Sequence, residues 1–304
     1  MLELTKIAGD TYTITVESGS VLGVYIFPDQ TCLLIDTTLK RRNAQKVYQF
    51  LLENNLYVIG IMNTHAHADH IGGNKYIQDN TGCAIYARPQ EAIYITYPVL
   101  KIQALYTAAL PREINNSIDV VEAAKVTDYI EPGSIIIKNR LFQVLDLAGH
   151  SIEHCGFVTP DGVAFVGDAL IGEEILQGFP YIYILDLAQY FKSLDYLAAN
   201  VNGPVVAGHG GLIADINKCR VKNLNLVKEI LEQYQLILSS QAMSREEMVR
   251  ETIRTRIDTP THIQYYMFFS TVSAYLAYLT EQKTIRSIIK DGVMRYKSYP
   301  VTLP

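Results

Sequence analysis

The sequence has no tryptophan and only four cysteines among its 304 residues. Cys32, Cys83, Cys155 and Cys219 lie far apart, and no two of them form a C-x-x-C pair. This pattern fits neither a cysteine-based zinc site nor the dense disulfide framework of a small secreted protein. We therefore expect reduced, mostly buried thiols, as in a cytoplasmic protein.

Long apolar runs and an excess of basic residues are also lacking. No stretch reaches the roughly 18 apolar residues that a membrane span needs, and Met1–Lys6 shows no basic segment followed by an apolar core, as an export signal would. The chain has 26 Lys and Arg against 31 Asp and Glu, which leaves a net charge of −5. Because nucleic-acid binders usually carry a basic face, we expect neither a nucleic-acid nor a membrane partner.

What the sequence does contain is an ordinary globular composition, with 49% apolar residues arranged in strand and helix patterns. Alternating or short apolar runs predict strands at 11–16, 21–27, 31–35, 58–62, 84–86, 135–137, 142–145, 163–166 and 204–207. Longer amphipathic segments predict helices at 41–54, 74–79, 187–199 and 213–239. Between them, residues 87–130 lack regular punctuation, and we interpret them as a partly helical insertion.

The sequence changes character after about residue 240. Ser244, followed by two glutamates, predicts the start of a helix, and a second helix is expected at 261–281. Strands at 284–289 and 293–299 flank Lys290-Asp291-Gly292, which is a hairpin signal. We therefore expect a main domain over 1–240, with the 87–130 insertion. Residues 241–304 are expected to form a small helical appendage that ends in a β-hairpin and resembles a degenerate winged helix.

The most informative segment is Thr64–Gly73, which reads T-H-A-H-A-D-H-I-G-G. It places His65, His67, Asp69 and His70 just after an expected strand and just before an expected helix. Imidazole nitrogens bind zinc-like ions well, and two rings at i and i+2 of an extended segment point to the same side. Four potential ligands so close together favour a metal site over a single catalytic histidine.

Three further candidate ligands share one local context. His150, Asp168 and His209 each follow an expected strand, within Gly-His, Gly-Asp and Gly-His-Gly sequences. Loops at strand ends are where layered α/β folds gather their functional residues. Each residue alone is weak support, since a polar residue beside glycine is often only part of a turn.

Taken together, these residues resemble the metallo-β-lactamase superfamily. The H-x-H-x-D-H motif is present as His65–His70, and His150, Asp168 and His209 follow in the order of the family. Leu33–Thr37 also matches a short family motif, although Thr38 stands where glycine is usual. The resemblance covers about residues 10–215.

The resemblance implies an α+β fold, namely a four-layer αββα sandwich with two metals held by loops along one edge of its sheets. His65, His67 and His150 would hold one metal, Asp69, His70 and His209 the other, and Asp168 would bridge them. His67 stands where the di-iron flavoprotein branch usually has a carboxylate, which favours zinc. Manganese or iron stays possible, because metal availability is not readable from sequence.

Two metals in such a site can lower the pKa of a shared water from about 15.7 to about 7 and so supply hydroxide for hydrolysis. Asp69 is the candidate catalytic residue that orients this water. Asp36 and Thr64 are candidates for hydrogen bonds that fix the orientation of the ligand rings. Candidate substrate contacts are Tyr94, Tyr97, Tyr106 and His262, although ordinary packing explains each of them equally well.

The metal ligands do not identify the substrate, because the family cuts lactams, thioesters, lactones, phosphoesters and sulfate esters. The absence of an export signal disfavours a true β-lactamase, and no basic cluster for glutathione is evident. We expect hydrolysis of a small ester, thioester, lactone or phosphoester.

Three alternatives stay open beside this interpretation. They are an iron-dependent oxidoreductase on the same ligands, a nuclease, and a binding module with a structural metal. The tyrosine-rich helix near the C-terminus could also mediate a homodimer.

Overall fold

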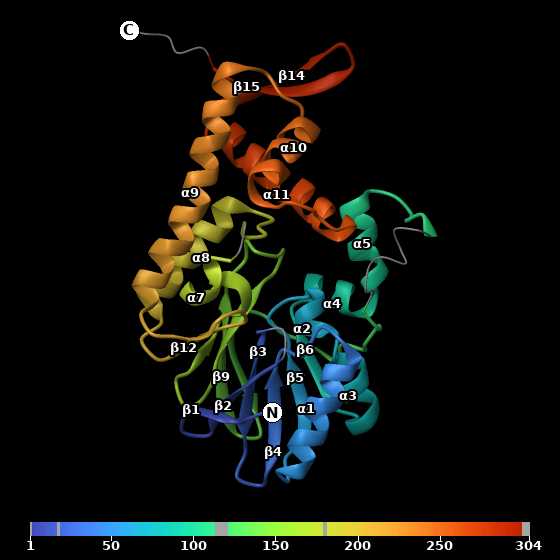
Figure 1. Ribbon diagram of the computed structural model, residues 1–304. Coiled ribbons are helices and arrows are strands. Elements are labelled where there is room, and N and C mark those ends of the chain that lie inside the picture. Colours follow the sequence, from blue (N-terminus) through green and yellow to red (C-terminus); the bar gives the residue numbers. More distant parts are fainter. Residues whose placement is uncertain (1, 17–18, 113–120, 179–180, 300–304) are drawn as a thin grey trace.

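The computed structural model describes residues 2–16, 19–112, 121–178 and 181–299. Its centre is a pair of β-sheets with helices on both outer faces (Figure 1). Helices α1 (Arg41–Glu53) and α3 (Asn74–Thr81) lie on one side, and α8 (Leu187–Asn200) and α9 (Ile216–Ser240) on the other. This is the predicted αββα sandwich.

The first sheet has seven strands in sequence order. They are β1 (Thr5–Ala8), β2 (Thr11–Thr15), β3 (Val21–Ile26), β4 (Thr31–Ile35), β5 (Tyr57–Met62), β6 (Ala84–Ala87) and β7 (Asp128–Tyr129). Strands β1 to β4 are antiparallel neighbours, whereas β4 to β7 run parallel. Because parallel neighbours need crossover connections, α1 joins β4 to β5 across the outer face.

The second sheet has six strands in the order β13-β12-β11-β10-β9-β8. They are β8 (Gly133–Ile137), β9 (Arg140–Asp146), β10 (Cys155–Val158), β11 (Ala164–Phe165), β12 (Val205–Ala207) and β13 (Gly211–Ile213). Only β11 and β12 are parallel. Their carboxyl ends therefore point the same way, and the segments that carry Asp168 and His209 leave the sheet side by side.

Side-chain alternation along the strands builds the layers. In β4, Leu33 and Ile35 face the second sheet, whereas Cys32 and Leu34 pack beneath the helices of the first side. A strand alternates its side chains between its two faces, so a strand buried on both faces is apolar throughout. All four cysteines are buried free thiols, as expected.

The insertion contains two helices, α4 (Pro89–Thr96) and α5 (Pro98–Tyr106), each with proline in its first turn. Proline suits that position because its missing N–H would have no helical partner there. Residues 113–120 of the predicted insertion lie outside the described part of the chain.

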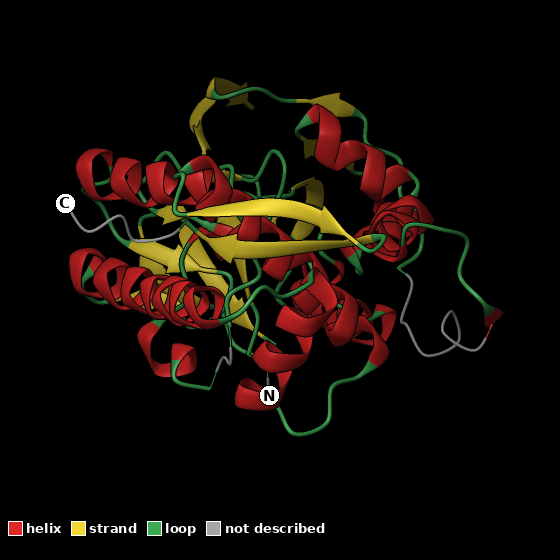
Figure 2. Ribbon diagram, turned by 90° about the horizontal axis from the view of Figure 1, so that it is seen from above, coloured by secondary structure: helices red, strands yellow, loops and turns green. Residues whose placement is uncertain are grey.

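The C-terminal region consists of α10 (Arg245–Arg256), α11 (His262–Glu281) and a hairpin of β14 (Ile285–Lys290) and β15 (Val293–Ser298). Ser244 and Glu247 form a capping box at the start of α10, which confirms the predicted helix start. Asp291 and Gly292 turn the hairpin with φ of 52° and 74°, as a two-residue turn with positive φ requires. Seen from the hairpin end, its strands lie across the helices (Figure 2).

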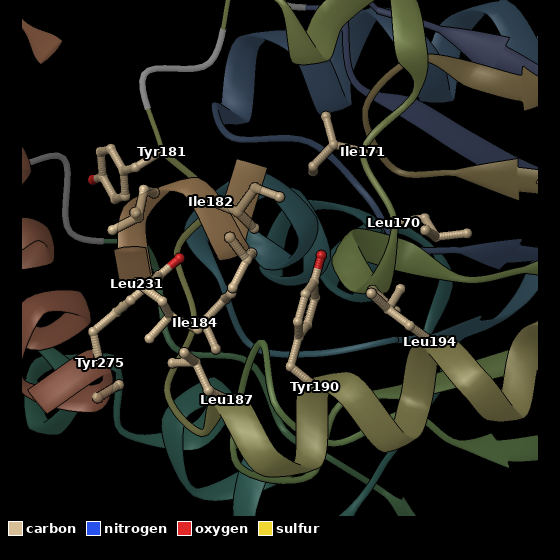
Figure 3. Packing of buried hydrophobic residues seen from close by; sticks show 14 of the residues in the cluster. Leu170, Ile171, Tyr181, Ile182, Ile184, Leu187, Tyr190, Leu194, Leu231 and Tyr275 are labelled. Atoms are coloured by element: carbon tan, nitrogen blue, oxygen red, sulfur yellow. The ribbon is translucent and has the colours of Figure 1, made fainter. Parts of the chain in front are cut away.

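One continuous hydrophobic cluster joins this region to the outer face of the second sheet. Leu194 of α8, Val227 of α9 and Tyr275 of α11 all belong to it. Figure 3 shows Tyr190 and Leu194 from α8, together with Leu231 and Tyr275. The division at residue 240 stays a prediction, and the buried cluster extends across it.

The structure adds elements that were not predicted from the sequence and moves the start of one predicted helix. Strands β1 and β10 were not predicted, because their four residues are too short and too mixed to show a pattern. The predicted helix at 213–239 begins later, at Ile216, because Gly211–Ile213 pairs with β12. Asp215 then caps α9 by accepting a hydrogen bond from the Lys218 backbone N–H.

Among the described residues, no helix is both long and apolar enough to cross a membrane.

Candidate metal centre

Two groups of potential metal ligands meet at one edge of the sheets. His65, His67, His150 and Asp168 form the first group. Asp69, His70, Asp168 and His209 form the second. Within each group, one ligand atom from every residue lies within 4.8 Å of the others. The structure thus brings together all seven residues of the predicted constellation, with Asp168 common to both groups.

Strand ends and one short helix position these side chains. His65 follows β5, and His67, in extended backbone, is the N-cap of α2 (Ala68–Ile71), which carries Asp69 and His70. His150 lies in the loop between β9 and β10, and His209 follows β12. Asp168 lies in the 3₁₀ turn η1 (Gly167–Ala169) after β11.

Asp36 and Thr64 orient two of the histidine rings. The Asp36 carboxylate accepts hydrogen bonds from the Thr64 N–H (2.8 Å), the Thr64 hydroxyl (2.7 Å) and His70 Nδ1 (2.8 Å). Because the Thr64 hydroxyl donates to Asp36, it accepts from His65 Nδ1 at 3.0 Å. Both rings therefore hydrogen-bond through Nδ1, and Nε2 is the nitrogen left to face a cation.

Main-chain groups orient two further histidines. His150 Nδ1 donates to the carbonyl of Tyr183 at 2.8 Å. His154 Nε2 accepts a hydrogen bond of 3.1 Å from the backbone N–H of Asp168. His154 thereby contacts the backbone of the residue that both ligand groups share.

The donor set fits metal ions. His65 Nε2, His70 Nε2 and Asp168 Oδ1 are buried and have no hydrogen-bond partner among the described residues. Leaving buried polar atoms unpaired costs about 1–3 kcal/mol each. Nitrogen and carboxylate donors at this spacing are those that zinc and similar divalent ions prefer. Coordination would satisfy all three atoms at once.

The electrostatics of the first group keep its rings neutral. Burial lowers the pKa of His65 and His67 well below its ordinary value, and it lowers the pKa of His150 to about 4. A neutral imidazole is the form that binds a metal. These three rings are therefore in the ligand form at neutral pH.

The second group holds more negative charge. Burial favours neutral His70, but the carboxylates of Asp168, Asp69 and Asp36 outweigh it and raise the pKa of His70 well above its usual value. Burial likewise opposes protonation of His209, yet Asp168 and Asp69 raise its pKa to about 10. The carboxylates thus attract positive charge to this part of the site.

Gly149, next to His150, shows how tightly the ligand loops are packed. Its φ is +131°, and an added Cβ would lie 2.3 Å from the backbone nitrogen of Tyr190. We expect Gly149→Ala to lower the free energy of unfolding by about 3 kcal/mol or more, measured by urea denaturation. Gly162→Ala is the matched control, because Gly162 also has positive φ (+79°) but no atom within 4 Å of the added Cβ. Equal losses in both variants would contradict a role for the Tyr190 contact.

A cavity of about 140 Å³ lies beside the first ligand group. Its lining includes His67, Tyr94, Lys101, Leu105 and Tyr183. A larger open hollow of about 730 Å³ lies between β9 and α8, but none of the seven candidate ligands lines it. Because His67 lines the smaller cavity, this cavity is the better candidate for substrate binding.

The four predicted substrate contacts are placed differently. Tyr94 lines the cavity, whereas Tyr97, Tyr106 and His262 are not among its described lining residues. Tyr97 is 60% exposed, and the Tyr106 ring packs edge-on against Tyr266 at 5.1 Å between centroids. His262 is an exposed residue at the start of α11.

Two charged residues near the site were not found from the sequence. Glu91 is 1% exposed and accepts hydrogen bonds from the loop that carries His65 and His67 and from the loop that carries His150. Lys101 donates a hydrogen bond to the backbone between His65 and His67. Burial lowers the pKa of Lys101 to about 8, so it is still mostly protonated at pH 7. Both residues lie on helices of the insertion, where no local motif marks them.

The sequence pattern of the metallo-beta-lactamase superfamily matches residues 18–209, a range that contains all seven candidate ligands. The chain belongs to this superfamily. A hydroxyacylglutathione hydrolase from Haemophilus ducreyi is 27% identical over 198 residues, which cover 64% of this chain and 66% of that protein. The chain spans about half the length of further hydroxyacylglutathione hydrolases, from Vibrio parahaemolyticus and Shewanella baltica.

Solved structures of this superfamily share the fold over almost the whole chain. A beta-lactamase domain protein from Burkholderia ambifaria has a TM-score of 0.78 at 17% identity, covering 98% of this chain and 94% of its own. A metallo-beta-lactamase family protein from Thermus thermophilus has a TM-score of 0.73 at 20% identity, covering 95% and 99%. At such coverage, the likeness extends to most of the C-terminal helices and hairpin of this superfamily member.

Proposed function

We propose that this superfamily member is a two-metal hydrolase that cleaves small thioester or ester substrates. The observation that carries the proposal is Asp168, which both ligand groups share, as a bridging residue between two metals would be. Bound divalent ions would polarise a substrate oxygen and lower the pKa of a water molecule. A structural zinc site is usually closed by four ligands and has no such second group.

Residues of the chain would hold the ions, orient the attacking water and fix the ligand rings. His65, His67 and His150 would hold one ion, and His70 and His209 the other. Asp69 is partly exposed, and its Oδ2 lies 3.0 Å from His209 Nε2. We propose that Asp69 both ligates the second ion and orients the attacking water. Asp36 and Thr64 fix the rings, so that the donor atoms are in place before metal or substrate arrives.

The thioester class is favoured by the relatives named hydroxyacylglutathione hydrolase. Zinc is the proposed metal, because the first group offers three neutral imidazoles. A cytoplasmic location and a homodimer stay predictions.

A hydrolysis panel on metal-analysed protein tests the proposal. We expect turnover of a thioester or ester, but not of a phosphodiester, phosphomonoester or β-lactam. A chelator should abolish the activity and added Zn²⁺ should restore it. His65→Ala should lower turnover by about 100-fold and reduce the metal content, with an unchanged circular dichroism spectrum. Two bound ions without hydrolysis of any ester would contradict the reaction class.

A further inference from the structure

Lys101 has carboxylates near it, those of Glu91, Asp69 and Asp168, whose charges favour its protonated form, but it has few direct polar contacts. Its ammonium donates one hydrogen bond, of 2.9 Å, to the carbonyl of Ala66, and lies 5.9 Å from the centre of the Tyr94 ring. Within the described part of the chain, no carboxylate lies within 4.0 Å of it. An ammonium has three N–H donors, so two have no acceptor among the described residues.

The carboxylate in the same cavity is already occupied. Glu91 accepts hydrogen bonds from the Ala66 N–H (2.8 Å), the Ser151 hydroxyl (2.5 Å) and the Glu153 N–H (3.1 Å). These three donors use both of its oxygens. Glu91 is therefore held by the two ligand loops, and it forms no ion pair with Lys101.

The position of Lys101 places its charge beside the metal centre. Ala66 lies between the ligands His65 and His67, and His67 itself lines the cavity. The rest of the wall is largely apolar, with Tyr94, Leu105 and Tyr183. A ligand that fills this space meets the Lys101 cation, a mostly apolar wall and the edge of the first ligand group, and the polar side chains of Glu91, Ser151 and Ser270 complete the lining.

We propose that Lys101 binds a carboxylate of the substrate, and that the natural substrates are anionic acyl compounds with an apolar portion. The proposal rests on the proposed hydrolase function and adds a substrate class to it. A carboxylate would satisfy the two remaining donors in charge-assisted hydrogen bonds, which are stronger than neutral ones. The small cavity volume favours a compact substrate over a long one.

Matched thioester pairs test this charge preference. One pair is the mono-thiophenyl ester of glutarate and thiophenyl pentanoate, which differ by a terminal carboxylate in place of a methyl group. The other pair places the carboxylate on the thiol, with the acetyl thioesters of 3-mercaptopropionate and propanethiol. We expect kcat/KM for the charged member of at least one pair to exceed that for the neutral member by about 10–100-fold.

Variants separate the charge from the hydrogen bond to Ala66. Lys101→Gln keeps a donor and removes the charge, so the ratio of kcat/KM for the charged member to that for the neutral member of the pair should fall to about one. Lys101→Arg keeps the charge and should retain most of the preference. Lys192→Met, in the larger hollow away from the site, is the control and should behave like wild type. If Lys101→Gln does not fold, Lys101→Met replaces it.

Calorimetry measures the binding of glutarate to the metal-loaded protein. This binding distinguishes failure of the Lys101 anion site from failure of the hydrolase function. Without any ester hydrolysis, glutarate binding at least 10-fold weaker in Lys101→Gln than in wild type would still support the anion site. Equal glutarate affinity in wild type and Lys101→Gln, or a charge preference that survives in Lys101→Gln, would overturn it.

Discussion

Replacing Asp168 with asparagine is expected to lower turnover by about 100-fold or more and to reduce the number of bound metal ions. Asp168 Oδ1 lies 3.3 Å from His70 Nε2, and Oδ2 lies 3.6 Å from His150 Nε2 and 3.5 Å from His209 Nε2. The side chain thus faces ligands of both groups. Asparagine keeps the shape but removes the charge and one of the two carboxylate oxygens, so it cannot serve two cations equally.

Metal titration followed by calorimetry measures this effect without relying on activity. Wild type should bind two ions per chain, and zinc should raise its melting temperature because it binds the folded state. Asp168→Asn should show fewer ions and a smaller rise. Asp195→Asn removes an exposed carboxylate of α8 that pairs with Arg220, and it should bind metal as wild type does. Full occupancy and near-native turnover in Asp168→Asn would rule out the two-metal assignment.

The individual strands and the H-x-H-x-D-H cluster could be predicted from local patterns, and the sandwich followed from the resemblance to the superfamily that these residues carry. Apolar runs such as Thr31–Ile35 indicate strands buried on both faces, and the H-x-H-x-D-H motif concentrates four donors in six residues. His150, Asp168 and His209 each follow an expected strand, which alone was weak support, and their match to the order of the family motif added them to the set. The structure places these residues together, and their roles as ligands are tested by the variants above.

What the sequence could not predict depends on contacts between distant segments. Strand β10 is recognisable only through its pairing with β9 and β11. The cavity forms where helices of the insertion approach His67, so Lys101 and Tyr94 share a wall although neither belongs to a motif. Tyr97 and Tyr106 were equally plausible from composition, but Tyr97 is exposed and Tyr106 packs against Tyr266 of α11. Specificity is therefore the property least accessible to sequence reasoning here.

Glu91→Gln is expected to weaken metal binding at the first ligand group by about 10–100-fold, although Glu91 is not itself a ligand. Its Oε2 accepts from the backbone N–H between His65 and His67, and its Oε1 accepts from Ser151 and Glu153, just after His150. One buried carboxylate thereby fixes the distance between the loop that carries His65 and His67 and the loop that carries His150. This is a positioning role, and it acts through backbone groups.

Glutamine cannot reproduce the arrangement in either orientation. Its single oxygen can face the Ala66 N–H or the Ser151 and Glu153 side, and the amide NH₂ then points at a backbone N–H on the opposite side. One buried donor is left unpaired, at a cost of about 1–3 kcal/mol. Zinc competition with a chelating dye measures the affinity, and thermal unfolding of the metal-free protein measures the stability.

The two measurements distinguish positioning from general stability. Glu229→Gln, which removes an exposed carboxylate of α9, should change neither zinc affinity nor stability appreciably. If Glu91→Gln lowers stability but leaves zinc affinity intact, Glu91 supports the fold without setting the ligand geometry. If both fall together, the loop spacing that Glu91 imposes is a condition for metal binding. Metal binding then depends on a residue of the insertion as well as on the ligands themselves. The same helical segment that forms the substrate cavity also holds the metal loops in place.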